Sequence, residues 1–153
     1  MKRLLQFFLS LFGISLLAGY TLSGVKAQEV FDPMAFRIDV THMIPQAYPS
    51  RTLSYGYFLK VHHDSVQVSL PYMGRVYQPE MNDEGLQFDL PYEHFKIENG
   101  RKESKQVCFT VKKSFIQYRF QITVWPNGRA DIFLSPSNAQ AVSYDGDLTG
   151  TGK

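Results

Sequence analysis

The sequence predicts an all-β fold, in which about eight to ten short antiparallel strands and little helix form a sandwich or a small barrel. Three observations support this prediction. Apolar and polar residues alternate with a period of two along most of the chain after Phe36, turn-forming residues separate the alternating runs, and helical periodicity is weak throughout. Because clean alternation leaves one face of each strand polar, it favours antiparallel pairing over a parallel sheet that is buried on both faces.

The first part of the alternating region predicts strands and a hairpin. Apolar residues occupy every second position in the runs 53–61 and 66–70, and in the run 36–44 except at His42. The sequence His-His-Asp-Ser at 62–65 separates the last two runs and predicts a turn between them. Phe58 is an exception in this region, because its ring lies on the face that the pattern makes polar. Phe133 likewise lies on the face that the pattern makes polar in the run at 130–134.

The second part continues the pattern in runs at 86–90, 95–97, 107–111, 118–124 and 130–134. Asn99-Gly100 marks one turn between strands. Asn127-Gly128, after Trp125-Pro126, predicts the clearest hairpin of the chain, because the two central residues of a type I′ turn need positive φ, which glycine accepts and asparagine tolerates. Single helical turns are expected only near 28–34 and 137–141.

The start of the chain predicts a cleaved secretory signal peptide over residues 1–27. Met-Lys-Arg precedes a mainly apolar run from Leu4 to Leu17. That run is shorter than the roughly 20 residues that a membrane-spanning helix needs. Val25-Lys26-Ala27 has the small or moderate side chains that signal peptidase reads. We therefore expect an exported, soluble product in the periplasm or beyond it.

Removal of this segment changes the charge of the protein. The full chain has 16 basic and 14 acidic residues. Residues 1–27 contain three of the basic residues and none of the acidic ones, so 13 basic residues remain against 14 acidic ones, a net charge of −1. Such a chain lacks the cationic excess that binds a phosphate backbone, and nucleic acid is not an expected partner. Residues 28–148 have the length of one domain, and 149–153 are expected to form a loose tail.

Cysteine and histidine usage argues against a lipid anchor, a disulfide and a metal site. Cys108 is the only cysteine, and it lies far from the cleavage site, so it neither forms an internal disulfide nor accepts a lipid at the new terminus. His62 and His63 are adjacent, but no second His or Cys pair at ligand spacing supports a metal centre. No stable membrane anchor, metal or other cofactor is expected.

Enzyme signatures such as a nucleophile elbow, a zinc-binding His-Glu-x-x-His or a phosphate-binding glycine loop do not occur. A group of carboxylates clusters around two Leu-Pro-Tyr tripeptides and is a candidate for acid–base chemistry on a glycan, although solvated loop charges are the favoured interpretation: Glu80, Asp83, Glu84, Asp89 and Glu93. The tripeptides end at Tyr72 and Tyr92. Each tyrosine is interpreted either as a cover for a strand end or as the rim of a shared ligand mouth.

Three motifs resemble an exported Bacteroidetes family catalogued as domain of unknown function 4251. They are Leu-Pro-Tyr-Met-Gly-Arg-Val-Tyr at 70–77, Gly-Leu-Gln-Phe at 85–88 and Ser-Asn-Ala-Gln-Ala-Val-Ser-Tyr-Asp-Gly at 137–146. The chain departs from the family pattern at Met73, where Phe is usual, and at Ala139, where Arg is usual. The resemblance implies one compact domain in the envelope of a Gram-negative cell and brings no activity with it. Arg75 and Tyr77, on matching positions, become candidates for a shared role.

These observations lead to three functional hypotheses. The first is a non-enzymatic binding module that holds a small amphipathic or glycan ligand in a β concavity, with Tyr72, Arg75, Tyr77 and Tyr92 as ligand-binding residues and no catalytic residue. The second is an accessory or structural protein that docks on another envelope protein through an aromatic sheet face. The third is a hydrolase of envelope glycans. The sequence leaves the oligomeric state open.

Overall fold

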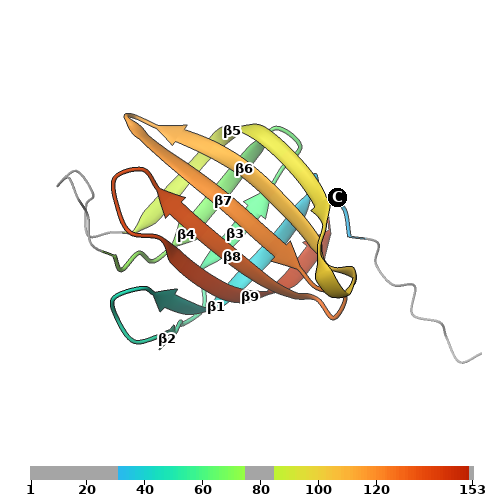
Figure 1. Cartoon of the computed structure of the whole chain (residues 1–153), viewed down its shortest axis with the longest axis horizontal. Coiled ribbons are helices and arrows are strands. Elements are labelled where there is room, and N and C mark those ends of the chain that lie inside the picture. The colour runs from blue at the N-terminus through green and yellow to red at the C-terminus, as the bar shows by residue number, and fades with distance from the viewer. Residues whose placement is uncertain (1–30, 75–84, 152–153) are drawn as a thin grey trace, which may run out of the picture.

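The computed structural model describes residues 31–74 and 85–151 and shows a closed antiparallel β-barrel (Figure 1). Its elements in chain order are β1 (Phe36–Pro45), β2 (Arg51–Thr52), β3 (Phe58–Val61), β4 (Ser65–Leu70), β5 (Leu86–Asn99), the 3-10 helix η1 (Arg101–Glu103), β6 (Lys105–Lys113), β7 (Ile116–Val124), β8 (Arg129–Pro136) and β9 (Val142–Thr151). The all-β prediction is confirmed, and of its two forms the barrel is the one observed. The predicted signal peptide at 1–27 lies outside the described residues.

Neighbouring strands in the barrel are also neighbours in the chain. The order runs from β1 through β3 to β9, and β9 pairs back with β1, so eight strands form an up-and-down barrel. β2 pairs only with the end of β1, as a short edge strand outside the closed ring. At the β1–β9 seam, a Cβ on Gly146 would overlap the carbonyl oxygen of Asp39, so a residue without a side chain allows the two strands to approach.

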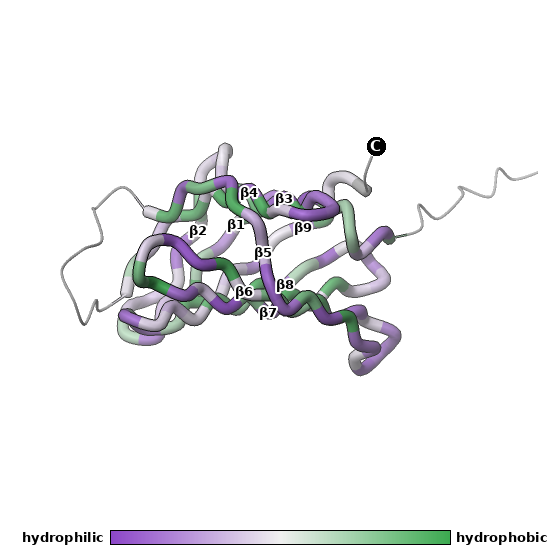
Figure 2. The backbone as a smooth tube through the Cα atoms, turned by 90° about the horizontal axis from the view of Figure 1, so that it is seen from above, coloured by the Kyte–Doolittle hydropathy of each residue, from purple (hydrophilic) through white to green (hydrophobic). Residues whose placement is uncertain are grey.

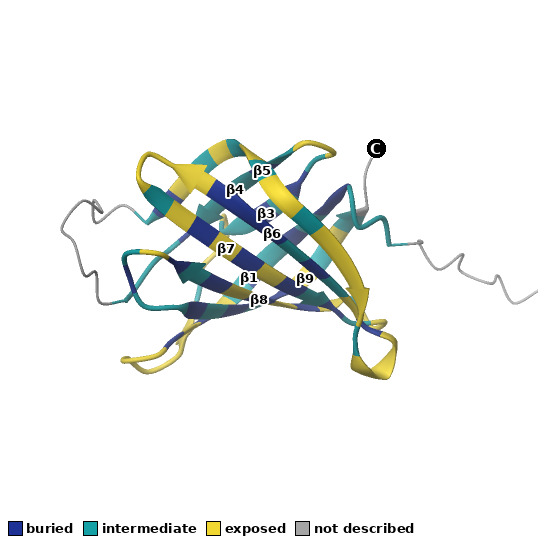
Figure 3. Ribbon diagram, turned by 45° about the horizontal axis from the view of Figure 1, so that its top comes forward, coloured by how far each residue is buried: buried dark blue, intermediate teal, exposed yellow. Residues whose placement is uncertain are grey.

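Apolar side chains fill the barrel and polar ones cover it. The alternating pattern appears as bands of buried and exposed residues along β6 and β7 (Figure 3). The interior holds an aromatic cluster in which Phe109 stacks on Phe120 with ring centroids 5.2 Å apart, and Tyr92 lies 5.3 Å from Phe109. Barrels of eight strands are just wide enough for such filling or for one small ligand. Here the filling occupies the middle of the barrel.

Strand β5 differs from the prediction of two separate strands. The runs at 86–90 and 95–97 belong to one strand, which pairs with β4 over residues 86–91 and with β6 over residues 92–99. The register shifts between Glu93 and Lys96, and His94 between them has a φ of 55°. This irregularity bends β5, and Figure 2 shows it crossing from the β3–β4 side of the barrel to the β6–β7 side.

The hairpin between β7 and β8 lies where it was predicted, but its turn is not type I′. Gly128 has a φ of 85°, whereas Asn127 does not have positive φ. The Gly128 N–H donates to the Trp125 carbonyl and the Trp125 N–H donates to the Arg129 carbonyl, both at 2.9 Å. These bonds enclose three loop residues, in the arrangement of a turn followed by a glycine bulge.

Two expectations for the rest of the chain need correction. Residues 149–151 are not loose, because β9 continues to Thr151 and pairs with the start of β1 through Gly150 and Arg37. In the described residues near 28–34 and 137–141 the chain makes turns without helix. Across the described parts of the chain, no helix has the length and apolar character that a membrane crossing requires.

Phe58 and Phe133 both lie on the outer wall, as their parity predicted. The guanidinium carbon of Arg37 lies 4.1 Å from the centroid of the Phe58 ring, and Arg37 also donates to Asp39 at 2.8 Å. Phe133 is 42% exposed on β8. Because β1 and β9 separate β3 from β8 in the sheet, the two rings do not form one aromatic face.

Candidate functional site

A pocket of about 420 Å³ lies at the end of the barrel where β4 ends and β5 begins. The β1–β2 hairpin and the chain leading to β3 form one wall, and the residues after β4 form the other. It is lined by Met43, Arg51, Thr52, Leu53, Ser54, Tyr57, Pro71, Tyr72, Met73 and Gly85. Hydroxyl groups, one guanidinium and two thioethers therefore face one space, which makes the pocket amphipathic.

Two tyrosines hold the segment after β4 against the loop that precedes β9. The Tyr72 hydroxyl donates to the Gln140 carbonyl at 2.7 Å, and the Tyr144 hydroxyl donates to the Pro71 carbonyl at 2.7 Å. Tyr144 is fully buried, and its burial raises the pKa of its hydroxyl far above the ordinary value, with a smaller contribution from Tyr72. Residues 70–74 of the first motif thus meet the motif at 137–146 beside the pocket.

Arg51 reaches the pocket from the edge strand β2. It is the cross-strand partner of Met43, whose side chain is 1% exposed and faces the interior. Directly paired residues project to the same face of a sheet, so Arg51 also projects inward. Its Nη1 lies 3.1 Å from the Met73 sulfur, a weak acceptor. Within the residues that the structure describes, no carboxylate pairs with this guanidinium.

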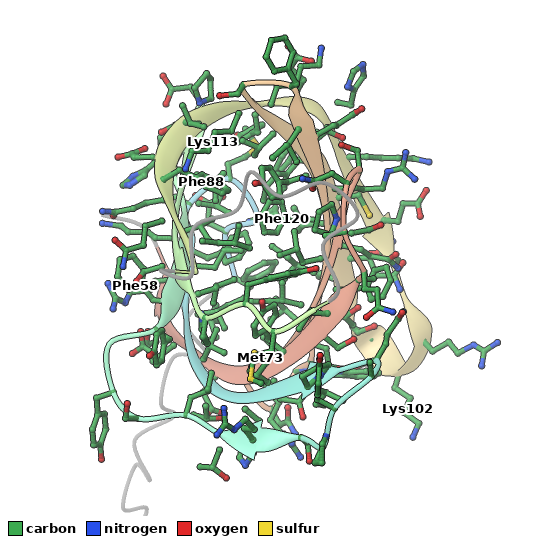
Figure 4. The ribbon with its side chains drawn as sticks, turned by 90° about the vertical axis from the view of Figure 1, so that its left-hand side faces the viewer. Phe58, Met73, Phe88, Lys102, Lys113 and Phe120 are labelled. Atoms are coloured by element: carbon green, nitrogen blue, oxygen red, sulfur yellow. The ribbon has the colours of Figure 1, made fainter. Side chains whose placement is uncertain are left out.

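Lys113 is a second cation on an inward position at this end of the barrel. It ends β6 on the parity of Val107, Phe109 and Val111, which are all buried in the interior. Its Nζ lies 5.8 Å from the centroid of the Phe88 ring. Looking into this end, Figure 4 shows Lys113 beside Phe88 within the ring of strands and Met73 on another side of the opening.

The predicted ligand-binding residues do not come together. Tyr72 lines the pocket, whereas Tyr92 lies toward the opposite end of the barrel, since Leu70 pairs with Leu86 at one end of β4 and Ser65 pairs with Pro91 at the other. There the Tyr92 hydroxyl donates to the His63 carbonyl at 2.7 Å. The two tyrosines therefore do not share a ligand mouth. Arg75 and Tyr77 lie outside the described residues.

The candidate carboxylates do not form a site in the described part of the chain. Asp89 and Glu93 are exposed on the outer wall of β5. Glu93 accepts a hydrogen bond from Lys112 at 2.9 Å, and this bond together with the lysine charge lowers the pKa of Glu93, the opposite of what a general acid needs. Glu80, Asp83 and Glu84 fall outside the described residues. Among residues 31–74 and 85–151, no group of three potential metal ligands occurs.

Sequence reasoning missed Arg51 and Lys113. The inward direction of Lys113 was predictable from the sequence, because Lys113 continues the alternation of the run at 107–111. That of Arg51 was not, since its inward direction depends on the pairing of a two-residue strand with β1.

Comparison with known proteins identifies the family. No curated protein matches this chain. A crystal structure of a DUF4251 family protein from Bacteroides eggerthii DSM 20697 matches the fold with a TM-score of 0.59 and 14% sequence identity, over 76% of this chain and 79% of that one. The family model described as Domain of unknown function (DUF4251) matches residues 23–148, which confirms the resemblance, and the chain therefore belongs to this family.

Proposed function

We propose that this protein is a non-enzymatic binding module that takes a small amphipathic or glycan ligand in the pocket at the β4–β5 end of the barrel. The observation that carries the proposal is the pocket itself. Its volume of about 420 Å³ falls in the range of small-molecule sites. It combines hydroxyl groups of Thr52, Ser54 and Tyr57 with the apolar side chains of Leu53 and Met73, so sugar hydroxyls and an apolar group would each find a complementary wall.

The chemistry of the lining favours binding over catalysis. No carboxylate, imidazole or thiol occurs among the described residues that line the pocket. These groups supply most general bases, and a hydroxyl such as that of Ser54 needs a general base beside it to act as a nucleophile. The thioethers of Met43 and Met73 instead suit adaptable contacts with a range of apolar shapes, because methionine is flexible and polarisable.

Export of the protein remains part of the proposal. The charged start and the apolar run of residues 1–27 support it, as does the Bacteroides source of the family structure. Intact-mass analysis of protein purified from its own cells tests it. A chain that begins at Gln28 would support export, and a chain that still carries residues 1–27 would contradict it.

Methionine methyl NMR tests ligand binding directly. Protein labelled with ¹³C at the methionine methyl groups is titrated with octyl β-D-glucoside, which joins a sugar to an alkyl chain. We expect the signals of Met43 and Met73 to shift. The signal of Met34, which precedes β1 at the opposite end of the barrel, should stay in place and serves as an internal control.

A pair of matched variants shows whether the shifts report the pocket. Ser54 is exposed and lines the pocket, and Ser54→Phe should fill part of the space and weaken binding at least tenfold. Ser50 is exposed on the neighbouring loop outside the lining, so Ser50→Phe should leave the affinity unchanged. Saturable shifts that are equal in both variants, or no shifts in the wild type, would overturn the proposal.

A protein partner is the second candidate, and the exposed loop tips at the same end of the barrel favour it. Tyr55 and Phe115 are 105% and 97% exposed, and Tyr48 on the β1–β2 loop is 46% exposed. Photo-crosslinking from position 55 in intact cells, with position 121 on the outer wall as control, tests it. A single defined protein product from position 55 alone supports docking through the tips, and identical products from both positions contradict it.

A further inference from the structure

We infer that the ligand of this pocket carries an oxyanion, such as a carboxylate, which binds the guanidinium of Arg51 while Lys113 adds positive potential at the same end of the barrel. The inference rests on the proposed function and names the class of ligand more closely. It follows from the direction of two cationic side chains and from the absence of described anionic partners beside them.

The direction of the Arg51 side chain favours an anionic ligand. An arginine at a pocket-facing position beside the barrel interior is unusual, because the buried side chains of that interior are almost all apolar. Arg51 shares its face with Met43 and contacts Met73 through the sulfur at 3.1 Å. A thioether leaves most of the guanidinium donors unused. The planar fork of these donors matches a carboxylate with two parallel hydrogen bonds.

The environment of the Lys113 side chain also favours an anionic ligand. Its neighbour Lys112 points outward and pairs with Glu93 at 2.9 Å, so the two lysines differ in environment although they are adjacent. The Lys113 ammonium instead leans over the Phe88 ring, and its polar contact is the Gln87 carbonyl at 3.4 Å. It lies beside an apolar surface without a carboxylate partner among the described residues.

The distribution of charged residues around the pocket agrees with an anionic ligand. Asp89 and Glu93, two of the three acidic residues of β5, face the outer wall, and the third, Glu98, pairs with Lys96. The pocket lining contains Arg51 and no acidic residue in the described chain. A ligand that is anionic at one end and apolar at the other would place its charge against Arg51 and its apolar part against Leu53 and Met73.

A structural role for Arg51 gives different expectations. A charge on a short edge strand also discourages pairing with the edge of another molecule. That role would be preserved by Arg51→Lys, and Arg51→Gln would then form larger oligomers than the wild type does. A role in ligand binding predicts instead that Arg51→Gln loses the preference for an anionic ligand and keeps the oligomeric state of the wild type. Sedimentation of each variant therefore accompanies every binding measurement.

The test uses probes that differ by one charged group. Octyl β-D-glucuronide and octyl β-D-glucoside have the same sugar ring and alkyl chain, and only the first has a carboxylate. Their dissociation constants are measured by calorimetry and by the Met43 and Met73 methyl shifts. Octanoate, which has the carboxylate without the sugar, shows whether the anion comes from an acidic sugar or from an alkyl acid.

We expect the glucuronide to bind the wild type at least tenfold more tightly than the glucoside, with an advantage that shrinks as salt is added. Arg51→Gln should abolish the advantage, so that the two glycosides bind this variant with equal affinity. Lys113→Gln should reduce it severalfold. Arg119→Gln on the outer wall of β7 and Lys112→Gln on the outward position of β6 are the controls and should have no effect.

The outcomes distinguish a failure of the anionic-ligand inference from a failure of the proposed binding function. Equal affinity for the two glycosides, or an advantage that survives in Arg51→Gln, would overturn the inference and leave the binding module standing. If none of the three probes shifts Met43 or Met73, both the binding module and this inference fail. Binding of octanoate or of the glucuronide alone supports the inference when it depends on Arg51, and it assigns the source of the anion.

Discussion

The two ends of the barrel are built differently, although each contains a Leu-Pro-Tyr tripeptide. At the far end, Tyr92 packs on Phe95 and Phe109 and closes the β3–β4 turn through its hydroxyl. At the other end, Tyr72 is bound to the Gln140 carbonyl and stands beside a pocket. The same tripeptide thus serves packing in one place, and in the other its proline and tyrosine line a pocket.

The difference between the two tyrosines comes from their position in the sheet. Pro71 follows the last residue of β4, where no ladder partner is needed, so the chain leaves the barrel and Tyr72 faces the pocket. Pro91 lies within β5, at the point where pairing passes from β4 to β6, and the strand continues through it. Tyr92 therefore stays on the inner face. The far end is a closed core, and the near end is an open site.

The largest expected effect is a difference in unfolding free energy between a substitution in the closed core and one in the open site. Phe109 is 1% exposed and touches three aromatic rings. Phe109→Ala should lower the free energy of unfolding by about 3–5 kcal/mol, because it leaves a cavity among rigid neighbours. Leu53→Ala, at a half-buried pocket residue, should cost only about 1 kcal/mol. Urea denaturation measures both, and equal losses would show that the pocket end is packed as tightly as the core.

A second prediction concerns alkaline pH and Tyr144, whose hydroxyl anchors the pocket segment. Burial raises its pKa in the folded protein above the ordinary value of 10.0, so the folded state holds the proton that the unfolded chain releases. Its contribution to stability is therefore complete below pH 10 and falls as pH rises above 10, by up to about 1.4 kcal/mol per pH unit. Urea denaturation between pH 8 and 11 should show a shallower decline in Tyr144→Phe. An unchanged slope would contradict the assignment.

How much of this contrast the sequence predicts depends on the range of the interactions. Alternation of apolar residues predicted most of the strands, the hairpins at 62–65 and 125–128 and the apolar interior, because each follows from a local period of two. Local patterns also suggested Tyr72 as a site residue. They did not predict that β5 is one bent strand, since its irregularity at His94 lies in a segment with weak alternation.

The site itself was less predictable, because it is assembled by pairings that are distant in the sequence. The separation of Tyr72 from Tyr92 follows from the register of β4 on β5, and no local pattern reveals this register. The inward direction of Arg51 follows in the same way from two residues paired with the end of β1. Residues 149–151 likewise belong to β9 because this strand pairs with β1. Their own sequence has no apolar side chain from which a strand could be predicted.

The smallest expected effect compares the two tyrosines directly through their hydroxyl groups. Tyr72→Phe and Tyr92→Phe each remove one donor and should each cost about 1 kcal/mol, because a carbonyl loses its partner in a partly buried place. Stability alone will not distinguish them, but location will. Amide hydrogen exchange should rise around Gln140 in the first variant and around the β3–β4 turn in the second. Only Tyr72→Phe should change the affinity for octyl β-D-glucoside. An equal change in Tyr92→Phe would mean that the two ends are coupled through the aromatic cluster that fills the barrel between them.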